Sequence, residues 1–220
     1  MYKFIKKEVF QLKACVIDID GTLIDFKKFD NQFISLHFAK HDIIQKLDNL
    51  LWKFNSLDIF TNRQSFLKIR LWIYCFLASD IVYSKLLKDY NSCYLTYQEK
   101  EFKKVMPLLD VIKNHGYSIY LISNNNICST IIQSSTSYNC LSPIIFNIKR
   151  NKLYKILSEE VNISYVIGNN YMDDILPSKK LKEGRNQELK SIYVGQSKIK
   201  HLFKTDFYVS SIDQIKKIVT

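Results

Sequence analysis

The sequence predicts an α/β protein, with a Rossmann-like parallel sheet covered by helices on both faces and a smaller α-helical domain. From Tyr117 onward, short apolar runs rich in β-branched residues alternate with segments of helical spacing. A further run of this kind occupies residues 14–19. The stretch from about 26 to 102 lacks such alternation and has helical spacing instead, for example at Phe66, Ile69 and Ile73.

The individual elements follow from the same patterns. Strands are expected at residues 15–19, 118–122, 144–146, 165–167, 192–194 and 207–209. Pro107 fits the first turn of a helix that runs to about His115 and stops at Gly116. A final helix is expected from Ser211, its cap, to Val219. Ligands of such sheets bind beyond the carboxyl ends of the strands, so the polar residues that follow the strands are the candidate functional residues.

The first expected strand leads into two acidic residues, Asp18 and Asp20, followed by Gly21. Successive strand residues face opposite sides, so the two acids share one side of the chain. Two like charges buried so closely cost free energy unless a cation lies between them or one is protonated. The pattern therefore predicts a metal site, an acid/base pair, or both.

The segment Asp18-Ile-Asp20-Gly-Thr-Leu resembles the first motif of the haloacid dehalogenase (HAD)-like hydrolase superfamily, most of whose members are Mg2+-dependent phosphohydrolases. The resemblance implies that Asp18 is the nucleophile that takes up the phosphoryl group. Asp20 would protonate the leaving group and then activate the water that hydrolyses the aspartyl-phosphate. Dehalogenases of the superfamily replace the second acid, so Asp20 favours phosphate-ester chemistry.

The second and third motifs of the superfamily have counterparts in order along the chain. Ser123 ends an apolar run and resembles the hydroxyl residue that binds the phosphoryl group, with backbone N–H groups near Asn124. The third motif is a lysine that neutralises phosphoryl oxygens. Lys149 is our first candidate for it, because apolar residues at helical spacing follow, and Lys152 is the second.

The fourth motif of the superfamily is a Gly-Asp pair followed by another acid, and it helps to hold Mg2+. Gly168 and Asp173 match this pattern, but Asn169 stands where the motif has its first acid. An amide oxygen can still bind a hard cation, although it adds no charge. The resemblance thus implies a Mg2+ site formed by Asp18, Asp20, Asn169 and Asp173. Asp174 is an alternative to Asp173.

The helical stretch lies between the first and second motifs, where many HAD-like enzymes insert a cap. We therefore expect residues 1–25 and 103–220 to form the α/β core domain and residues 26–102 to form a helical cap domain. A cap of this kind closes over the site, excludes water and selects the substrate.

The amino-acid composition indicates which kinds of binding partner and which cellular compartment to expect. The 220 residues include 32 Lys and Arg against 21 Asp and Glu, a net charge of +11. The lysines are scattered without one dominant tract, which argues against direct nucleic-acid binding and suits attraction of a small phosphorylated substrate. Five cysteines without a Cys-x-x-Cys pair indicate reduced thiols. With no signal peptide and no apolar run long enough to span a membrane, we expect a cytoplasmic protein.

The leading functional interpretation is a Mg2+-dependent phosphatase of a small phosphorylated metabolite. A catalytically weakened HAD-like binding or regulatory protein is the main alternative, because of Asn169 and the missing Pro after the third-motif lysine. A phosphotransferase and a nucleic-acid phosphatase stay open. The substrate and the oligomeric state are not specified by the sequence.

Overall fold

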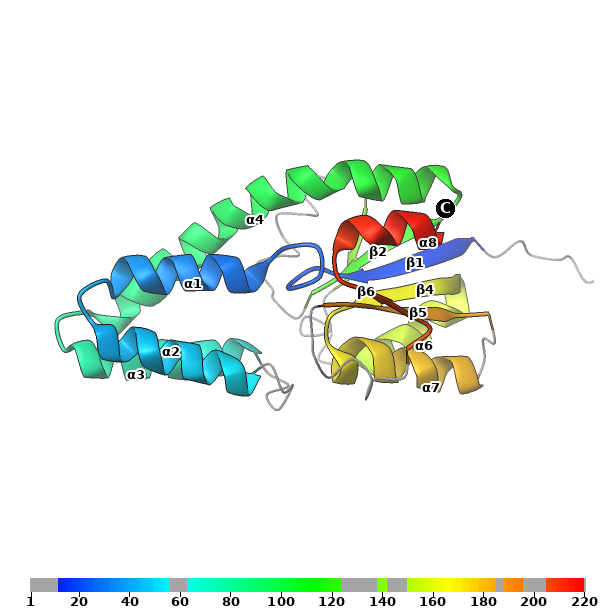
Figure 1. Cartoon of the computed structure of the whole chain (residues 1–220). Helices are drawn as coiled ribbons and strands as arrows, with labels where there is room; N and C mark the ends of the chain where they lie inside the picture. The colour runs from blue at the N-terminus through cyan, green and yellow to red at the C-terminus, as the bar shows by residue number, and fades with distance from the viewer. Residues whose placement is uncertain are drawn as a thin grey trace, which may run out of the picture.

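The computed structural model describes residues 12–55, 63–123, 138–141, 150–184, 188–195 and 205–219. Within these ranges six parallel strands form one sheet in the order β3-β2-β1-β4-β5-β6 (Figure 1). The strands are β1 (Lys13–Asp18), β2 (Ser118–Ile122), β3 (Asn139–Leu141), β4 (Asn162–Gly168), β5 (Lys190–Val194) and β6 (Phe207–Val209). The predicted α/β fold class with a parallel sheet is confirmed.

The predicted strand positions agree closely with these elements. The bounds of β2 and β6 are those predicted, and β4 and β5 extend the predicted runs outward. Strand β1 begins two residues earlier than expected and ends at Asp18. The predicted strand at 144–146 lies outside the described residues. Strand β3 was not predicted, because three residues with one exposed and two half-buried side chains leave little apolar pattern.

Strand β1 occupies the position in the sheet where a ligand is expected. It pairs with β2 on one side and β4 on the other, with Ile17 opposite both Leu121 and Ile167. The chain order reverses between β1 and β4, which makes this the topological switch point of the sheet. The carboxyl ends of the two strands therefore bring Asp18 and Asn169 to the same edge.

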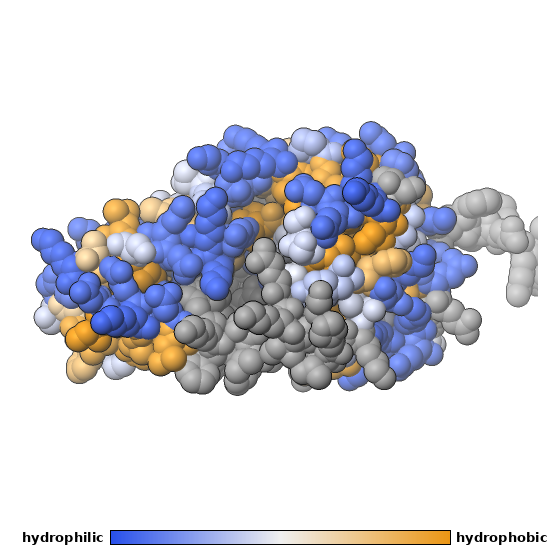
Figure 2. Space-filling view, in the orientation of Figure 1, coloured by the Kyte–Doolittle hydropathy of each residue, from blue (hydrophilic) through white to orange (hydrophobic). Residues whose placement is uncertain are grey.

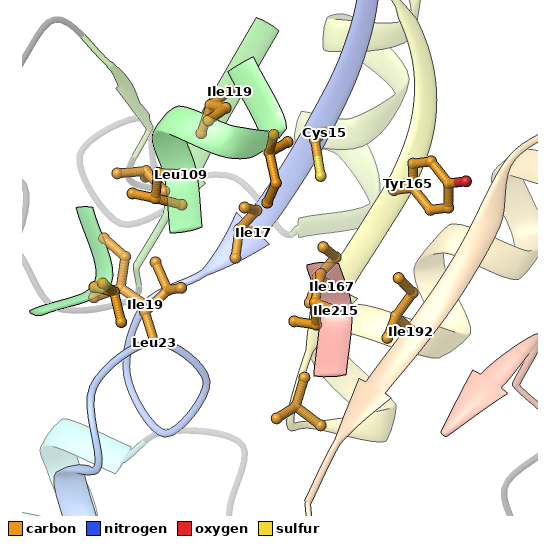
Figure 3. Packing of buried hydrophobic residues seen from close by; sticks show 14 of the residues in the cluster. Cys15, Ile17, Ile19, Leu23, Leu109, Ile119, Tyr165, Ile167, Ile192 and Ile215 are labelled. Atoms are coloured by element: carbon orange, nitrogen blue, oxygen red, sulfur yellow. The ribbon is translucent and has the colours of Figure 1, made fainter. Parts of the chain in front are cut away.

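Alternate residues of β1 pack against opposite helical layers. Cys15, Ile17 and Ile19 belong to one apolar cluster, with side chains of α4 and α8 (Lys216–Val219) (Figure 3). Ala14 and Val16 belong to another, with α6 (Arg150–Glu160) and α7 (Leu176–Gly184). Asp18 is two residues after Val16, so its side chain lies on the same side of the strand and faces the α6 layer.

Helix α4 (Tyr83–Asn114) is longer than the sequence predicts. Pro107 lies inside it, so the prediction of a helix that begins at Pro107 is wrong. Buried side chains on both sides of the proline stabilise the continuous helix: Phe102, Val105, Leu109 and Ile112 pack on the sheet. The predicted stop is present, because Gly116 has a φ of +86°.

The first half of α4 joins α1 (Phe26–His37), α2 (Asp42–Asn55) and α3 (Arg63–Ala78) in a helical unit with its own apolar cluster. This unit stands beside the sheet, and α4 runs from one to the other (Figure 1). The predicted boundary at residues 102 and 103 falls within α4. Inside the unit, buried Arg70 forms ion pairs with Asp30 and Asp48.

Exposed apolar side chains concentrate on the helical unit, and Figure 2 shows such surface at its end away from the sheet. They are Leu36, Ile43, Leu50, Ile69, Trp72, Phe76, Leu77 and Val82. Of the helices described, none combines the length and the apolar character needed to cross a bilayer.

Candidate active site

Asp18 lies at the carboxyl end of β1, is only 6% exposed, and has a donor on each carboxylate oxygen. Thr22 Oγ1 donates to Asp18 Oδ2 over 3.0 Å, and Arg150 Nη2 donates to Asp18 Oδ1 over 2.6 Å. The turn after β1 folds back so that the backbone N–H of Leu23 donates to the carbonyl of Ile19. Gly21 in this turn has a φ of +89°, a conformation that glycine adopts without strain.

Arg150 joins the end of β1 to the end of β4. It is the first residue of α6, and its side chain is 93% buried. Its guanidinium donates to Asp18 through Nη2 and to Asp174 through Nη1. Burial alone would lower the pKa of Arg150, but the charge of Asp18 and the hydrogen bond to it raise that pKa overall. Arg150 is therefore a fixed positive charge between two carboxylates.

Asp174 reaches this position because the chain after β4 forms a π-helical turn over Tyr171–Ile175. Asn170 begins the turn, and its Oδ1 accepts from the backbone N–H groups of Met172 and Asp173. The backbone N–H of Asn170 in turn donates to Asp174 Oδ2 over 3.0 Å. Asp174 is fully buried, and the turn directs its carboxylate to Arg150.

Asp20 contacts both the sheet and the helical unit. Ser123, directly after β2, donates from Oγ to Asp20 Oδ2 over 2.6 Å. From α4, Tyr94 OH and Gln98 Nε2 both donate to Asp20 Oδ1, the latter over 3.2 Å. The structure thus brings the predicted residues Asp20 and Ser123 into direct contact.

The remaining predicted residues have different positions. Asn124 and Lys149 lie outside the described residues. Lys152 is exposed on α6, and no contact places it beside Asp18. Asp173 is half-buried and accepts from Asn170 Nδ2 over 3.3 Å, whereas its neighbour Asp174 reaches Arg150.

Of four further residues at the site, three were not predicted from the sequence. Arg150 stands between the two lysines that we considered for the third motif, and a basic residue at the start of a helix was the signal. Asp174 was weighed only as an alternative. Tyr94 and Gln98 are 74 and 78 residues from Asp20, and no local pattern marks them as its partners.

The donor set is compatible with Mg2+. Among the described residues, the Oδ1 atom of Asn169 is buried and has no hydrogen-bond partner. Asn169 follows β4, the strand that pairs with β1, and an amide oxygen is a suitable ligand for a hard cation. No group of three or more His, Cys, Asp or Glu side chains within the described ranges forms a metal cluster. Mg2+ does not need one, since it commonly keeps several waters.

Sequence comparisons identify no relatives: no protein-family model matches the chain, and no curated protein matches it. Comparison with solved structures does find similar proteins. A putative HAD-hydrolase, YfnB from Bacillus subtilis, bound to magnesium, superposes with a TM-score of 0.59 at 12% identity, covering 95% of this chain and 99% of that one. The L-2-haloacid dehalogenase RSc1362 superposes with a TM-score of 0.62 at 14% identity, covering 95% of this chain and 99% of that one.

A HAD phosphatase from Thermococcus onnurineus gives a TM-score of 0.51 at 16% identity, covering 94% of this chain and 97% of that one. These similarities extend over nearly the whole of each chain. The chain therefore has the fold of the HAD-like hydrolases, as its motifs predict. At such low identities the likeness establishes the fold alone.

Proposed function

We propose that this protein is a HAD-like phosphatase that hydrolyses a small phosphorylated substrate through an aspartyl-phosphate on Asp18, with Mg2+ as cofactor. The observation that carries the proposal is the arrangement of Asp18 and Asp20 at the switch point of the sheet. Asp18 is paired with Arg150, and Asp20 is hydrogen-bonded to Ser123. A nucleophile and an acid/base thus occupy separate environments, which is what two-step phosphoryl transfer requires.

In the first step an Asp18 carboxylate oxygen attacks phosphorus and the bond from phosphorus to the leaving oxygen breaks. Asp20 gives its proton to that oxygen. The guanidinium of Arg150 lies at Asp18 and would neutralise charge on the phosphoryl oxygens as they approach. When substrate binds, the single hydroxyl proton of Ser123 would turn from Asp20 to the same group, in the role that we predicted for it.

In the second step Asp20, now a carboxylate, takes a proton from water, and the water oxygen attacks phosphorus. The bond between phosphorus and Asp18 breaks, which releases inorganic phosphate and restores the carboxylate. When bound, Mg2+ supplies charge neutralisation between nucleophile and phosphate. Asp18 and Asn169 would hold it, with Asp20 and Asp173 as the further ligands predicted from the motifs.

The helical unit over residues 26–102 would act as the cap that selects the substrate. It lies between the first two motifs in the sequence, and α4 carries Tyr94 and Gln98 from it to Asp20. The net charge of +11 would attract anionic phosphorylated compounds to the protein.

A binding protein with little hydrolytic activity is the second candidate. Asn169 removes one negative charge from the expected cation site, and Arg150 already balances the charge of Asp18. Both observations favour weaker Mg2+ binding. A dehalogenase is disfavoured, because Asp20 is an acid at the position where those enzymes lack one.

Phosphate release from a panel of phosphorylated metabolites, with and without Mg2+, tests the proposal. Wild type is compared with Asp18→Asn, which keeps the shape of the side chain but removes the nucleophile. We expect Mg2+-dependent release in wild type and a loss of at least about 1,000-fold in the variant. Equal release from both purified proteins would refute the mechanism. No release across the panel, with no Mg2+ binding, would favour the binding protein.

A further inference from the structure

The helical unit holds the carboxylate of Asp20 from one face of α4. Tyr94 and Gln98 are four residues apart, so they lie one above the other on the helix. Both donate to the same oxygen, Oδ1 of Asp20, while Ser123 donates to Oδ2. The orientation of the Asp20 carboxyl group is therefore determined jointly by the sheet and by the helical unit.

Packing fixes the donors themselves. Tyr94 is 1% exposed and Gln98 is 2% exposed. The ring of Tyr94 contacts Phe26 and Phe29 of α1, with centroid distances of 5.2 and 4.9 Å. Because Phe26 and Phe29 belong to α1, the phenol ring is packed within the helical unit.

We propose that Tyr94, supported by Gln98, is a positioning residue for Asp20, and that it makes proton transfer by Asp20 depend on the placement of the helical unit. The inference rests on the proposed function. Without the phenol, the carboxyl group would keep only the donors of Gln98 and Ser123 from this set and would rotate away from the leaving oxygen. Misplacement of a reacting group by about 1 Å can lower a rate ~100-fold.

The chemistry of the leaving group separates this role from a structural one. An alkyl phosphate has a poor leaving group and depends on protonation, whereas p-nitrophenyl phosphate has a good one and needs little. A residue that acts through Asp20 affects the first substrate much more than the second. A residue that only supports the fold affects both alike.

The helix offers a matched control in Tyr90, one turn before Tyr94. Tyr90 is also 1% exposed, and its hydroxyl donates to the buried Asp30 within the helical unit over 2.8 Å. Tyr90→Phe and Tyr94→Phe thus remove the same atom from the same helix. The two rings belong to one cluster, with centroids 6.4 Å apart, but only the second variant removes a hydrogen bond to Asp20.

The experiment measures kcat and KM of wild type, Tyr94→Phe and Tyr90→Phe with an alkyl phosphate and with p-nitrophenyl phosphate. For Tyr94→Phe we expect kcat to fall at least ~10-fold with the alkyl phosphate and less than ~3-fold with p-nitrophenyl phosphate, at unchanged KM. Tyr90→Phe should change both substrates by the same factor. Equal losses with both substrates for Tyr94→Phe would overturn the positioning role while leaving the phosphatase proposal intact.

A measurement independent of activity covers the case in which the proposed function fails. Thermal unfolding midpoints are measured for Tyr94→Phe, Asp20→Ala and the double variant. A hydrogen bond between the two residues predicts that the double variant loses less than the sum of the single shifts. Additive shifts would overturn the proposal. If Asp18→Asn keeps wild-type activity, the phosphatase proposal falls, and this cycle alone decides whether Tyr94 fixes Asp20.

Discussion

The side chain of Asp174 occupies the space directly above the backbone of Gly168. A Cβ atom at Gly168 would lie 2.2 Å from Asp174 Oδ2 and 2.5 Å from its Cβ, distances at which something must shift. Asp174 cannot easily move, because Arg150 and the backbone N–H of Asn170 hold its two oxygens. The glycine at the end of β4 thus lets the π-helical turn fold Asp174 back toward Asp18.

Gly168→Ala should therefore disturb the pairing of Asp174 with Arg150. We expect the free energy of unfolding to fall by about 2–3 kcal/mol, the cost of overpacking a buried site. Chemical denaturation measures this. Gly184→Ala is the control, since a Cβ there meets nothing within 4 Å and should be neutral or slightly stabilising. Equal stability of the two variants would contradict the account.

A substitution that removes the positive charge of Arg150 should lower the free energy of unfolding more than one that keeps the charge. Arg150→Met leaves Asp18 and Asp174 as buried acids without their cation, and we expect the free energy of unfolding to fall by about 3 kcal/mol at pH 7. Arg150→Lys keeps the charge and should recover part of this loss. Denaturant unfolding of the two variants provides the comparison. A methionine variant as stable as wild type would show that the guanidinium does not offset the two charges.

Much of the sheet was predictable because its strands are buried on both faces. In β1, for example, residues 14–17 are all apolar and all buried, which gives a continuous signal between Lys13 and Asp18. The prediction of a helix that begins at Pro107 was wrong because the local sequence does not contain the deciding information. A proline at the start of a helix and one inside a long helix look alike locally, and here packing of Phe102 and Val105 before the proline decides for the longer helix.

The site was predictable where the chemistry is local and not where it depends on distant packing. The Asp18 and Asp20 pair stands out within a few residues of sequence. The choice between Asp173 and Asp174 depends on whether the turn after β4 is α- or π-helical, which residue spacing does not reveal. Tyr94 depends on how the helical unit is placed against the sheet.

Asp206 should make stability depend on pH. Burial raises its pKa, but hydrogen bonds from the backbone N–H of Ser191, from Lys182 and from the Ser191 hydroxyl lower it overall. A pKa lower in the folded state means that the carboxylate stabilises the fold above the unfolded pKa of about 3.9. This contribution is lost as the pH falls through the folded pKa.

Asp206→Asn should therefore lower the free energy of unfolding at pH 7 by only about 1 kcal/mol, because solvent screens a side chain that is 31% exposed, and the difference should shrink as the pH falls through the folded pKa. Urea unfolding of both proteins across this pH range measures it. The exposed Asp213→Asn makes the same change in net charge without these contacts and should show a smaller difference. A loss that stays constant with pH would rule out the ionised carboxylate as its cause.

Asn169→Asp tests whether the orphaned amide oxygen belongs to a cation site. Its Oδ1 is buried at the end of β4 beside β1, so a carboxylate there adds a like charge near Asp18. Without Mg2+ we expect the free energy of unfolding to fall by about 1–3 kcal/mol, because that charge is buried without a partner. With Mg2+ the loss should be recovered, and Mg2+ should bind about ten-fold more tightly than to wild type, since charge count sets affinity for hard cations. Titration calorimetry and thermal unfolding measure the two effects.

Asn162→Asp adds the same charge at the opposite end of β4 and should leave Mg2+ affinity unchanged. If Asn169→Asp folds but binds Mg2+ no better, the cation is held elsewhere at this edge, and Asp173 becomes the ligand to test.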